Sequence, residues 1–215
     1  MSERITASDL ARMLVAAAQC LRERHEYLSQ LDSVAGDGDH GTTMLRSAEQ
    51  MDAAAQDASL ETPGALLKDT GWRVLSVDGG ASSALLGTFL TGMGEAAGED
   101  DLDCAALAAV FESGLNALFK QTKARPGDKT MVDALAPAVA AIRSAAQAAN
   151  SIAAALQDAA AAAETGAEST KALVARYGRA RLLGEKTLTH ADAGAASIAL
   201  IFHGFSQPFL AQREN

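Results

Sequence analysis

Three aspartates lie within eight positions of the segment LDSVAGDGDHGTTM, residues 31–44. Asp32, Asp37 and Asp39, called the acid cluster below, bring three negative charges close together, which costs free energy unless a cation or a shared proton relieves the repulsion. Carboxylate oxygens suit hard cations, and magnesium usually combines a few of them with water and substrate phosphates. The segment therefore predicts a site for magnesium or calcium.

An EF-hand calcium loop is one alternative, because residues 37–39 read DGD, as such a loop begins. With Asp37 in the first position, Thr42 stands where the loop needs Gly, and Ala48 stands where it needs a bidentate Glu. A calcium loop of this type is therefore excluded.

A second alternative is structural: one acid caps the next helix and the others are solvated surface charges. A cap needs one acid rather than three, and Gly36, Gly38 and Gly41 leave the backbone open to close approach by a ligand. Residues 40–44, HGTTM, have the character of a helix start, whose free N–H groups form a natural phosphate site. Two magnesium ions would then link the acid cluster to a nucleotide diphosphate, which a chain of formal net charge −9 could not otherwise hold.

Three further segments could contribute to the same site. GGASS, residues 79–83, offers N–H and hydroxyl groups to phosphate, and PGDKTM, residues 126–131, combines a turn, a cation and a helix cap at Asp128. Arg179 and Asp192 flank a long polar loop, where an arginine could neutralise developing phosphoryl charge. Among the four histidines, His40 is the site candidate. A P-loop or Rossmann site is excluded, because no GxxxxGK[ST] sequence occurs and no predicted strand precedes a Gly-rich turn.

Helices must position these segments, because Ala and Leu supply most of the apolar content and aromatic residues only 4%. We expect about eight helices and no strand. Apolar residues at helical spacing predict a long first helix over about 6–31, with these residues on one face: Leu10, Met13, Leu14, Ala17, Leu21 and Leu28. Later helices are predicted at about 41 into the fifties, from Thr62-Pro63 to near 77, at 83–97, 102–119, after 128, at 150–166 and at 195–205.

Local details of two later helices are also predicted. Thr62 suits an N-cap and Pro63 the first helical position. The Ala-rich stretch 150–166 is interpreted as a helix rather than a linker, with core positions at Ile152, Leu156, Leu173 and Val174.

The chain as a whole fits a single domain, 1–215. Its negative charge excludes a broad surface for nucleic acid or an anionic membrane. No secretory core or membrane span is found, so a cytoplasmic protein is expected. Cys20 and Cys104 are expected to be buried free thiols.

The chain resembles the nucleotide-binding L subunit of dihydroxyacetone kinases in four segments that occur in the same order: LDSVAGDGDHGTTM, GGASSALLGTF, KARPGDKTMVDALAP and GRARLLGEKTLTHADAGAASIAL. The resemblance implies an all-α barrel of eight antiparallel helices, which binds ADP or ATP at one end through two magnesium ions.

The resemblance also assigns roles to residues. It implies metal ligation by Asp32, Asp37 and Asp39, and direct participation in phosphoryl transfer by Asp37, Asp39 and Arg179. The nucleotide contacts that it implies are His40, Gly41, Thr42, Thr43, Ala81, Ser82, Thr122, Met131, Arg179, Asp192, Ala193 and Gly194. Ser83 and Thr122 stand where the family commonly has Gly, and Ala193 replaces the Pro of a typical DPGA sequence.

The implied partners are a separate K subunit, which holds the ketose covalently on a histidine, and a phosphoryl-donor M subunit. Within the family the donor is either free ATP or a phosphoprotein of the phosphoenolpyruvate system that recharges bound ADP, and the motifs are compatible with both. The chain carries no K-type region. Two alternatives remain: an ATP-dependent kinase subunit for a related ketose such as erythrulose, and a non-catalytic metal-binding helical scaffold.

Overall fold

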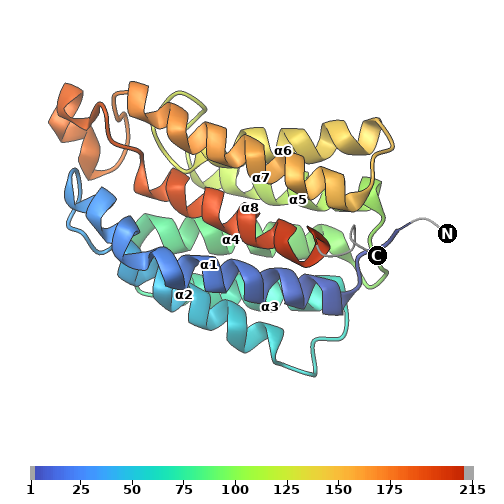
Figure 1. Ribbon diagram of the computed structural model, residues 1–215. Helices are drawn as coiled ribbons and strands as arrows, with labels where there is room; N and C mark the ends of the chain where they lie inside the picture. Colours follow the sequence, from blue (N-terminus) through green and yellow to red (C-terminus); the bar gives the residue numbers. More distant parts are fainter. Residues whose placement is uncertain (1–2, 211–215) are drawn as a thin grey trace.

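The protein is all-helical, as the sequence predicts. A computed structural model describes residues 3–210, and within them no strand occurs, only one isolated bridge between Ile5 and Leu102. The helices are α1 (Ala7–Ser33), α2 (His40–Ala55), α3 (Pro63–Leu75), α4 (Gly80–Ala97), α5 (Cys104–Gln121), α6 (Val132–Gln147), α7 (Ile152–Ser169) and α8 (Ala193–Leu210), with 3-10 helices η1 (Thr170–Ala172) and η2 (Arg179–Thr187) between the last two (Figure 1).

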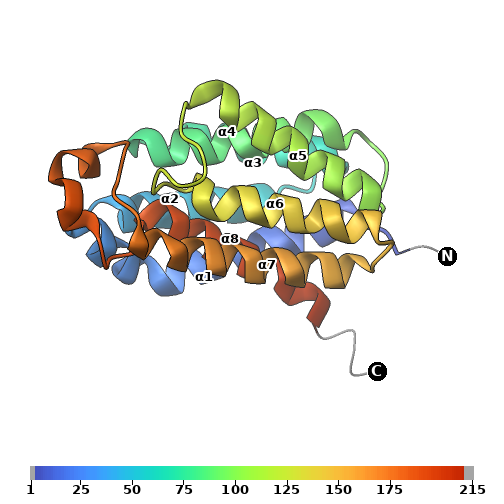
Figure 2. The same cartoon turned by 90° about the horizontal axis from the view of Figure 1, so that it is seen from above.

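The helices run antiparallel to their neighbours in sequence. Each α-helix packs against the next one, and α8 also packs against α1. As a result α2, α4, α6 and α8 all begin at one end of the bundle, the left end of Figure 1, which we call the site end. The odd-numbered helices begin at the other end, which we call the cap end (Figure 2). The topology therefore gathers the loops 34–39, 76–79, 122–131 and 170–192 at the site end.

The apolar face predicted for α1 is confirmed, since all six of its named residues are buried. The first turn is held by a capping box, in which Thr6 and Asp9 exchange side-chain and backbone hydrogen bonds. Thr62 and Pro63 start α3 as predicted, because the Thr62 hydroxyl accepts a hydrogen bond from the Ala65 N–H group. The Ala-rich α7 is a helix with Ile152 and Leu156 in the core.

The few aromatic residues are concentrated in one place. Phe89, Phe111, Phe202 and Phe205 join α4, α5 and α8, with ring centroids 5.6 to 6.2 Å apart. Aromatic pairs at this separation add to the burial of their surface. Elsewhere small residues allow close contact: a Cβ atom at Gly204 would lie 2.4 Å from the Cα atom of Ala17, so α8 and α1 pack backbone against backbone.

Several local predictions were wrong. Asp128 does not cap α6; its carboxylate accepts from the Arg125 N–H group at 2.8 Å and pairs with Arg176 at 3.3 Å, because the chain turns once more before the helix. Val174 is 37% exposed, since the chain has already left α7. Cys20 and Cys104 are free but only partly buried.

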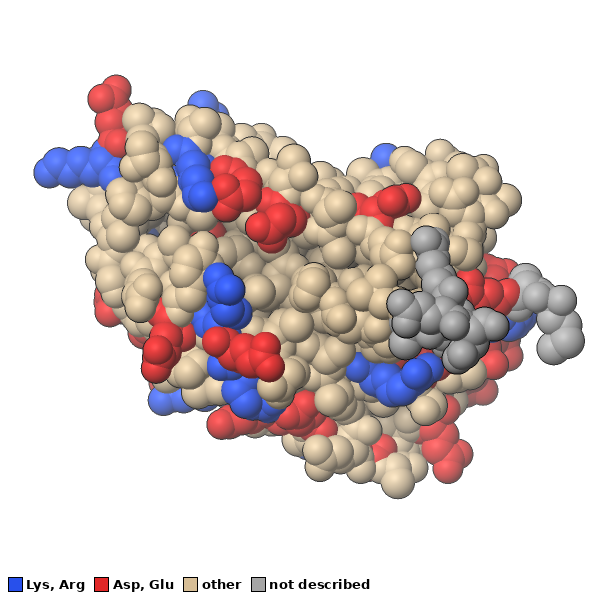
Figure 3. Space-filling view, viewed as in Figure 1, with Lys and Arg blue, Asp and Glu red and all other residues tan. Residues whose placement is uncertain are grey.

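The surface agrees with the charge analysis. On the face shown in Figure 3, Lys and Arg are interspersed with Asp and Glu and do not form a continuous basic area. Across residues 3–210, no helix combines the length and the apolar character that a bilayer crossing requires.

Candidate functional site

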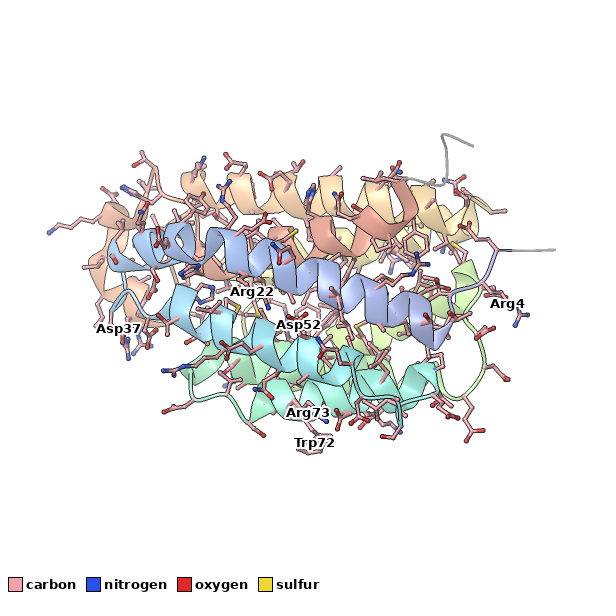
Figure 4. All side chains as sticks on the ribbon, turned by 60° about the horizontal axis from the view of Figure 1, so that its bottom comes forward. Arg4, Arg22, Asp37, Asp52, Trp72 and Arg73 are labelled. Carbon is pink, nitrogen blue, oxygen red and sulfur yellow. The ribbon has the colours of Figure 1, made fainter. Side chains whose placement is uncertain are left out.

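The acid cluster lies at the site end. One carboxylate oxygen from each of Asp32, Asp37 and Asp39 can be chosen so that the three atoms lie within 4.8 Å of one another. Asp32 belongs to the last turn of α1, and the other two to the loop that leads into α2. Figure 4 shows Asp37 at this end of the bundle, remote from Trp72 and Arg73 on α3.

The loop of the acid cluster is shaped by hydrogen bonds to Asp32. The Asp32 carboxylate accepts from the N–H groups of Gly38, at 2.9 Å, and His40, at 3.4 Å. Gly38 has φ 78°, a left-handed conformation that suits glycine. A Cβ atom at Gly36 would lie 2.2 Å from Asp32 Oδ1, so only glycine leaves this carboxylate where it is. Asp32 therefore both faces the cluster and fixes its loop.

Asp39, the acid next to α2, does not act as a helix cap. Asp39 stands at the N-cap position of α2, but its side chain makes no capping hydrogen bond. Among the described residues, the N–H groups of Gly41 and Thr42 in the first turn also have no acceptor. The acid at the N-cap position therefore does not cap α2, and the one contact of the cluster with the helix start is the long hydrogen bond from the His40 N–H group to Asp32. The helix start keeps its donors for an anion.

The carboxylates of the acid cluster fit a magnesium ion. The three groups are oxygen ligands of the kind that hard cations prefer, and both residues of the loop, Asp37 and Asp39, are exposed to solvent. Two N–H groups at Asp32 and the guanidinium of Arg179 at Asp37 offset part of the negative charge, and a divalent cation would relieve the repulsion that remains.

Arg179 reaches the acid cluster from the long loop before α8. Its guanidinium forms an ion pair with Asp37, although the two residues lie far apart in sequence. The side chains are 67% and 45% exposed, so the pair contributes little to stability. The structure thus brings Arg179 and Asp37 together, as a shared site requires.

His40 connects the starts of α2 and α4. Its Nδ1 lies 3.2 Å from the Ser82 hydroxyl, in the first turn of α4. The residue is 5% exposed, and its buried Nε2 has no hydrogen-bond partner in the described part of the chain. Burial lowers the pKa of His40 below its ordinary value, against the opposing effects of the Asp32 carboxylate and of the Ala193 backbone. An unpartnered buried nitrogen indicates a ligand or a water molecule at this point.

Thr43 and the Gly-rich turn before α4 are in direct contact. Thr43 is buried, and a Cβ atom at Gly79 would lie 2.1 Å from the Thr43 methyl group. Neither α2 nor α4 has a side-chain cap at its start. Two helix N-termini with free donors therefore lie side by side, with Thr42 and Ala81 exposed in their first turns.

The start of α8 also lies at the site end. Asp192 Oδ1 accepts from the Ala195 N–H group at 2.7 Å and so caps α8. Burial raises the pKa of Asp192 to about 6, against the opposing effects of that hydrogen bond and of Lys129. A Cβ atom at Gly194 would lie 3.4 Å from the Met131 Cβ atom, so Met131 and Gly194 face each other closely, next to the buried Ala193.

The side chain of Thr122, another predicted contact, forms a hydrogen bond within its own loop. It is the C-cap residue of α5, and its hydroxyl accepts from the Ala124 N–H group at 3.1 Å.

The sequence indicates Lys129 only as the cation of PGDKTM. In the structure it is 5% exposed, and its ammonium donates to two carbonyl groups of the loop before α8. Nothing in the local sequence distinguishes a buried lysine from a solvated one, because the partners lie far along the chain.

Comparisons with known proteins agree on one family. Residues 34–207 match the model of the DAK2 domain. The chain is 34% identical over 195 residues to the ADP-binding subunit DhaL of the PEP-dependent dihydroxyacetone kinase of Escherichia coli, covering 90% of this chain and 93% of that subunit. It is 36% identical to the D-erythrulose kinase of Mycolicibacterium smegmatis, over 89% of this chain but 33% of that protein.

A solved structure supports the same assignment. The dihydroxyacetone kinase from C. freundii in complex with AMP-PNP and Mg2+ superimposes with a TM-score of 0.72 at 27% identity. The superposition covers 97% of this chain and 35% of that one. The chain therefore has the fold of one part of that larger kinase.

Proposed function

This chain belongs to the DAK2 domain family, and on that premise we propose that it is the nucleotide-binding subunit of a dihydroxyacetone kinase, a phosphotransferase. The observation that supports this most directly is the acid cluster beside the uncapped start of α2. A site of this kind offers carboxylates to a metal ion and N–H groups to phosphate, and a solved relative is a complex with AMP-PNP and Mg2+.

We assign the two functions of the site to different residues. Asp32, Asp37 and Asp39 would hold two magnesium ions, which when bound neutralise the phosphate oxygens of ADP or ATP. The first turns of α2 and α4 would contact the nucleotide. Those contacts are His40, Gly41, Thr42, Thr43, Ala81 and Ser82.

The remaining contacts close the other side of the nucleotide. Met131 and the start of α8, residues 192–194, which lie against each other, would contact the nucleotide as well, as would Thr122 at the end of α5. Arg179 would exchange its ion pair with Asp37 for the transferring phosphoryl group and stabilise its charge. Catalysis then depends on positioning and charge neutralisation rather than on a covalent intermediate of this chain.

The acceptor is proposed to be a small ketose, dihydroxyacetone or a relative such as erythrulose, held on a separate K subunit. The bound nucleotide is recharged by a phosphoprotein M subunit or exchanged for free ATP. We further propose that residues 1–215 form one domain, a barrel of eight antiparallel helices, which the closed order of neighbour contacts supports.

A binding experiment tests this function first. The purified protein is denatured and the supernatant is examined for adenine nucleotide by absorbance, and the thermal unfolding of nucleotide-free protein is followed with ADP or ATP, with and without magnesium. We expect a rise in melting temperature of several degrees that requires magnesium, because a ligand that binds only the folded state stabilises it. No shift with either nucleotide would overturn the proposal and favour the non-catalytic scaffold.

Phosphoryl transfer is then measured with a purified K subunit, using dihydroxyacetone and erythrulose in parallel. Nucleotide that stays bound through purification, together with transfer that requires a phosphorylated M subunit, supports recharging of ADP. Transfer from free ATP alone supports the other donor. The ratio of the rates for the two ketoses identifies the acceptor.

A further inference from the structure

The side chain of Lys129 reaches both ends of the loop between α7 and α8. Lys129 Nζ donates to the carbonyl oxygens of Thr170, at 2.5 Å, and His190, at 2.6 Å. Thr170 directly follows α7, and His190 lies three residues before α8. One ammonium group therefore joins the two ends of the segment 170–190, which we call the lid loop.

Lys129 is not an ordinary surface lysine. It is 5% exposed, and a buried cation is tolerated only where acceptors and opposite charges surround it. The two carbonyl groups supply the acceptors, and the carboxylates of Asp192 and Asp133 supply the charge. Because Thr170 ends the run of α7, its carbonyl also lies at the negative end of a helix dipole.

Backbone conformation on both sides supports a fixed arrangement. Lys129 has φ 60° and Thr189, next to His190, has φ 70°. Residues other than glycine adopt this left-handed conformation at a cost, which persists where the surrounding structure holds them. Two strained positions therefore meet at the same contact.

Further hydrogen bonds converge on the base of the lid loop. The Thr170 hydroxyl accepts from the Asp192 N–H group at 2.9 Å, and the Lys171 carbonyl accepts from the Thr189 N–H group at 2.8 Å. The carbonyl of Asp128, the neighbour of Lys129, accepts from the Arg176 N–H group at 3.1 Å. The ends of the lid loop are thus tied to each other and to the loop before α6.

We propose that Lys129 is a positioning residue whose buried ammonium closes the base of the lid loop, and so holds Arg179 at Asp37 and the start of α8 beside Met131. For the nucleotide pocket this inference rests on the proposed function. Lys129 itself need not touch the nucleotide. It acts through the lid loop, which carries Arg179, and through the start of α8.

Lys129→Met tests the inference, because methionine keeps the length and apolar stem but loses the donors and the charge. Lys123→Met is the matched control, since Lys123 lies in the same loop and is exposed. Amide hydrogen exchange is measured on nucleotide-free protein. We expect exchange across 171–189 to accelerate at least tenfold in Lys129→Met, with the core of α1 and α5 unchanged, and no change in Lys123→Met.

ADP affinity in magnesium is measured on the same proteins. We expect the dissociation constant to rise at least tenfold in Lys129→Met, and to recover partly in Lys129→Gln, which restores a donor without the charge. If the wild type binds no ADP, the proposed function fails, whereas the exchange result still decides the role of Lys129.

Two results for Lys129→Met would overturn the inference. One is an amide exchange rate across 171–189 equal to that of the wild type. The other is an acceleration spread equally over all helices, which would mean that Lys129 stabilises the whole fold rather than the lid loop. Should Lys129→Met not fold, as judged by circular dichroism, Lys129→Gln takes its place with the same two criteria.

Discussion

The two ends of the helical bundle treat their helix starts differently. At the cap end, α1, α3, α5 and α7 all begin with a side-chain cap, provided in turn by Thr6, Thr62, Asp103 and Ser151. At the site end, the N-cap residues of α2 and α4 make no side-chain capping hydrogen bond, whereas the first N–H group of α6, at Val132, donates to the Thr130 hydroxyl and α8 is capped by Asp192. A missing cap costs stability, typically about 1 kcal/mol for each helix.

The difference indicates where ligand binding has been retained at the expense of stability. The cap end is also tied by backbone pairs, between Ile5 and Leu102 and from Gly64 to Gly98, so its polar groups are satisfied within the chain. The site end combines free N–H donors, a buried imidazole nitrogen without a partner and three converging carboxylates. Groups that protein partners leave unsatisfied are those that a ligand can use.

Removing one charge from the acid cluster should have the largest effect. Asp37→Asn keeps the size of the side chain but weakens magnesium binding, so phosphoryl transfer with a K subunit should fall by roughly a thousandfold, the upper range for loss of one electrostatic group. Asp100→Asn, an exposed acid at the cap end, is the control and should keep full activity. The melting temperature should stay within a few degrees of the wild type in both.

Activity near the wild-type level in Asp37→Asn would mean that the site end does not bind the ligand through the acid cluster. It would show that the acid cluster is a set of solvated surface charges.

The capped helix of the site end gives the next prediction. The pKa of Asp192 rises from its ordinary value of 3.8 to about 6, so the folded state holds a proton that the unfolded state has released between these pH values. As the pH rises from about 4 to above 6, the free energy of unfolding therefore falls by about 3 kcal/mol. Asp192→Asn keeps the acceptor for Ala195 and should abolish this loss.

Urea denaturation at several pH values between 4 and 7.5 checks this, with magnesium and nucleotide removed. The difference in unfolding free energy, variant minus wild type, should grow as pH rises through this window. A difference that does not change with pH would mean that the Asp192 carboxyl group titrates normally.

The sequence predicts features that depend on neighbouring residues better than features that depend on distant ones. The face of α1 and the cap at Thr62 follow from local spacing and residue type, which is why these predictions are confirmed. The convergence of the acid cluster is also predictable, because its three residues are close in sequence and lie within one helical turn and the loop after it. In each case the deciding contacts lie within a few residues.

The wrong predictions involve contacts that are distant in sequence. Asp128 was expected to cap α6, but it pairs with Arg176 across 48 positions. The burial of Lys129 depends on carbonyl groups 41 and 61 positions away. Local propensity contains no information on how loops meet at the end of a bundle, so the resemblance to a family supplied most of the predicted contacts there.

Arg179 offers a smaller test, because it links the lid loop to the acid cluster. In Arg179→Gln the rate of phosphoryl transfer should fall roughly thirtyfold, the value for a charged hydrogen bond of about 2 kcal/mol. The unfolding free energy of the nucleotide-free protein should change by less than about 0.5 kcal/mol, because the pair with Asp37 is exposed. The rate is measured at saturating nucleotide, and a wild-type rate would remove Arg179 from the reaction.

Asp103→Ala, at the cap end, should give the smallest effect and completes the comparison. The Asp103 carboxylate accepts from the Ala106 N–H group at 2.9 Å and starts α5, so its loss should lower the unfolding free energy by about 1 kcal/mol. Because α5 begins at the end remote from the acid cluster, nucleotide affinity and transfer rate should equal those of the wild type. Denaturant unfolding and calorimetric titration with ADP measure the two quantities. If affinity fell together with stability, the two ends would be energetically coupled, and the separation of capped and ligand-binding helix starts would fail.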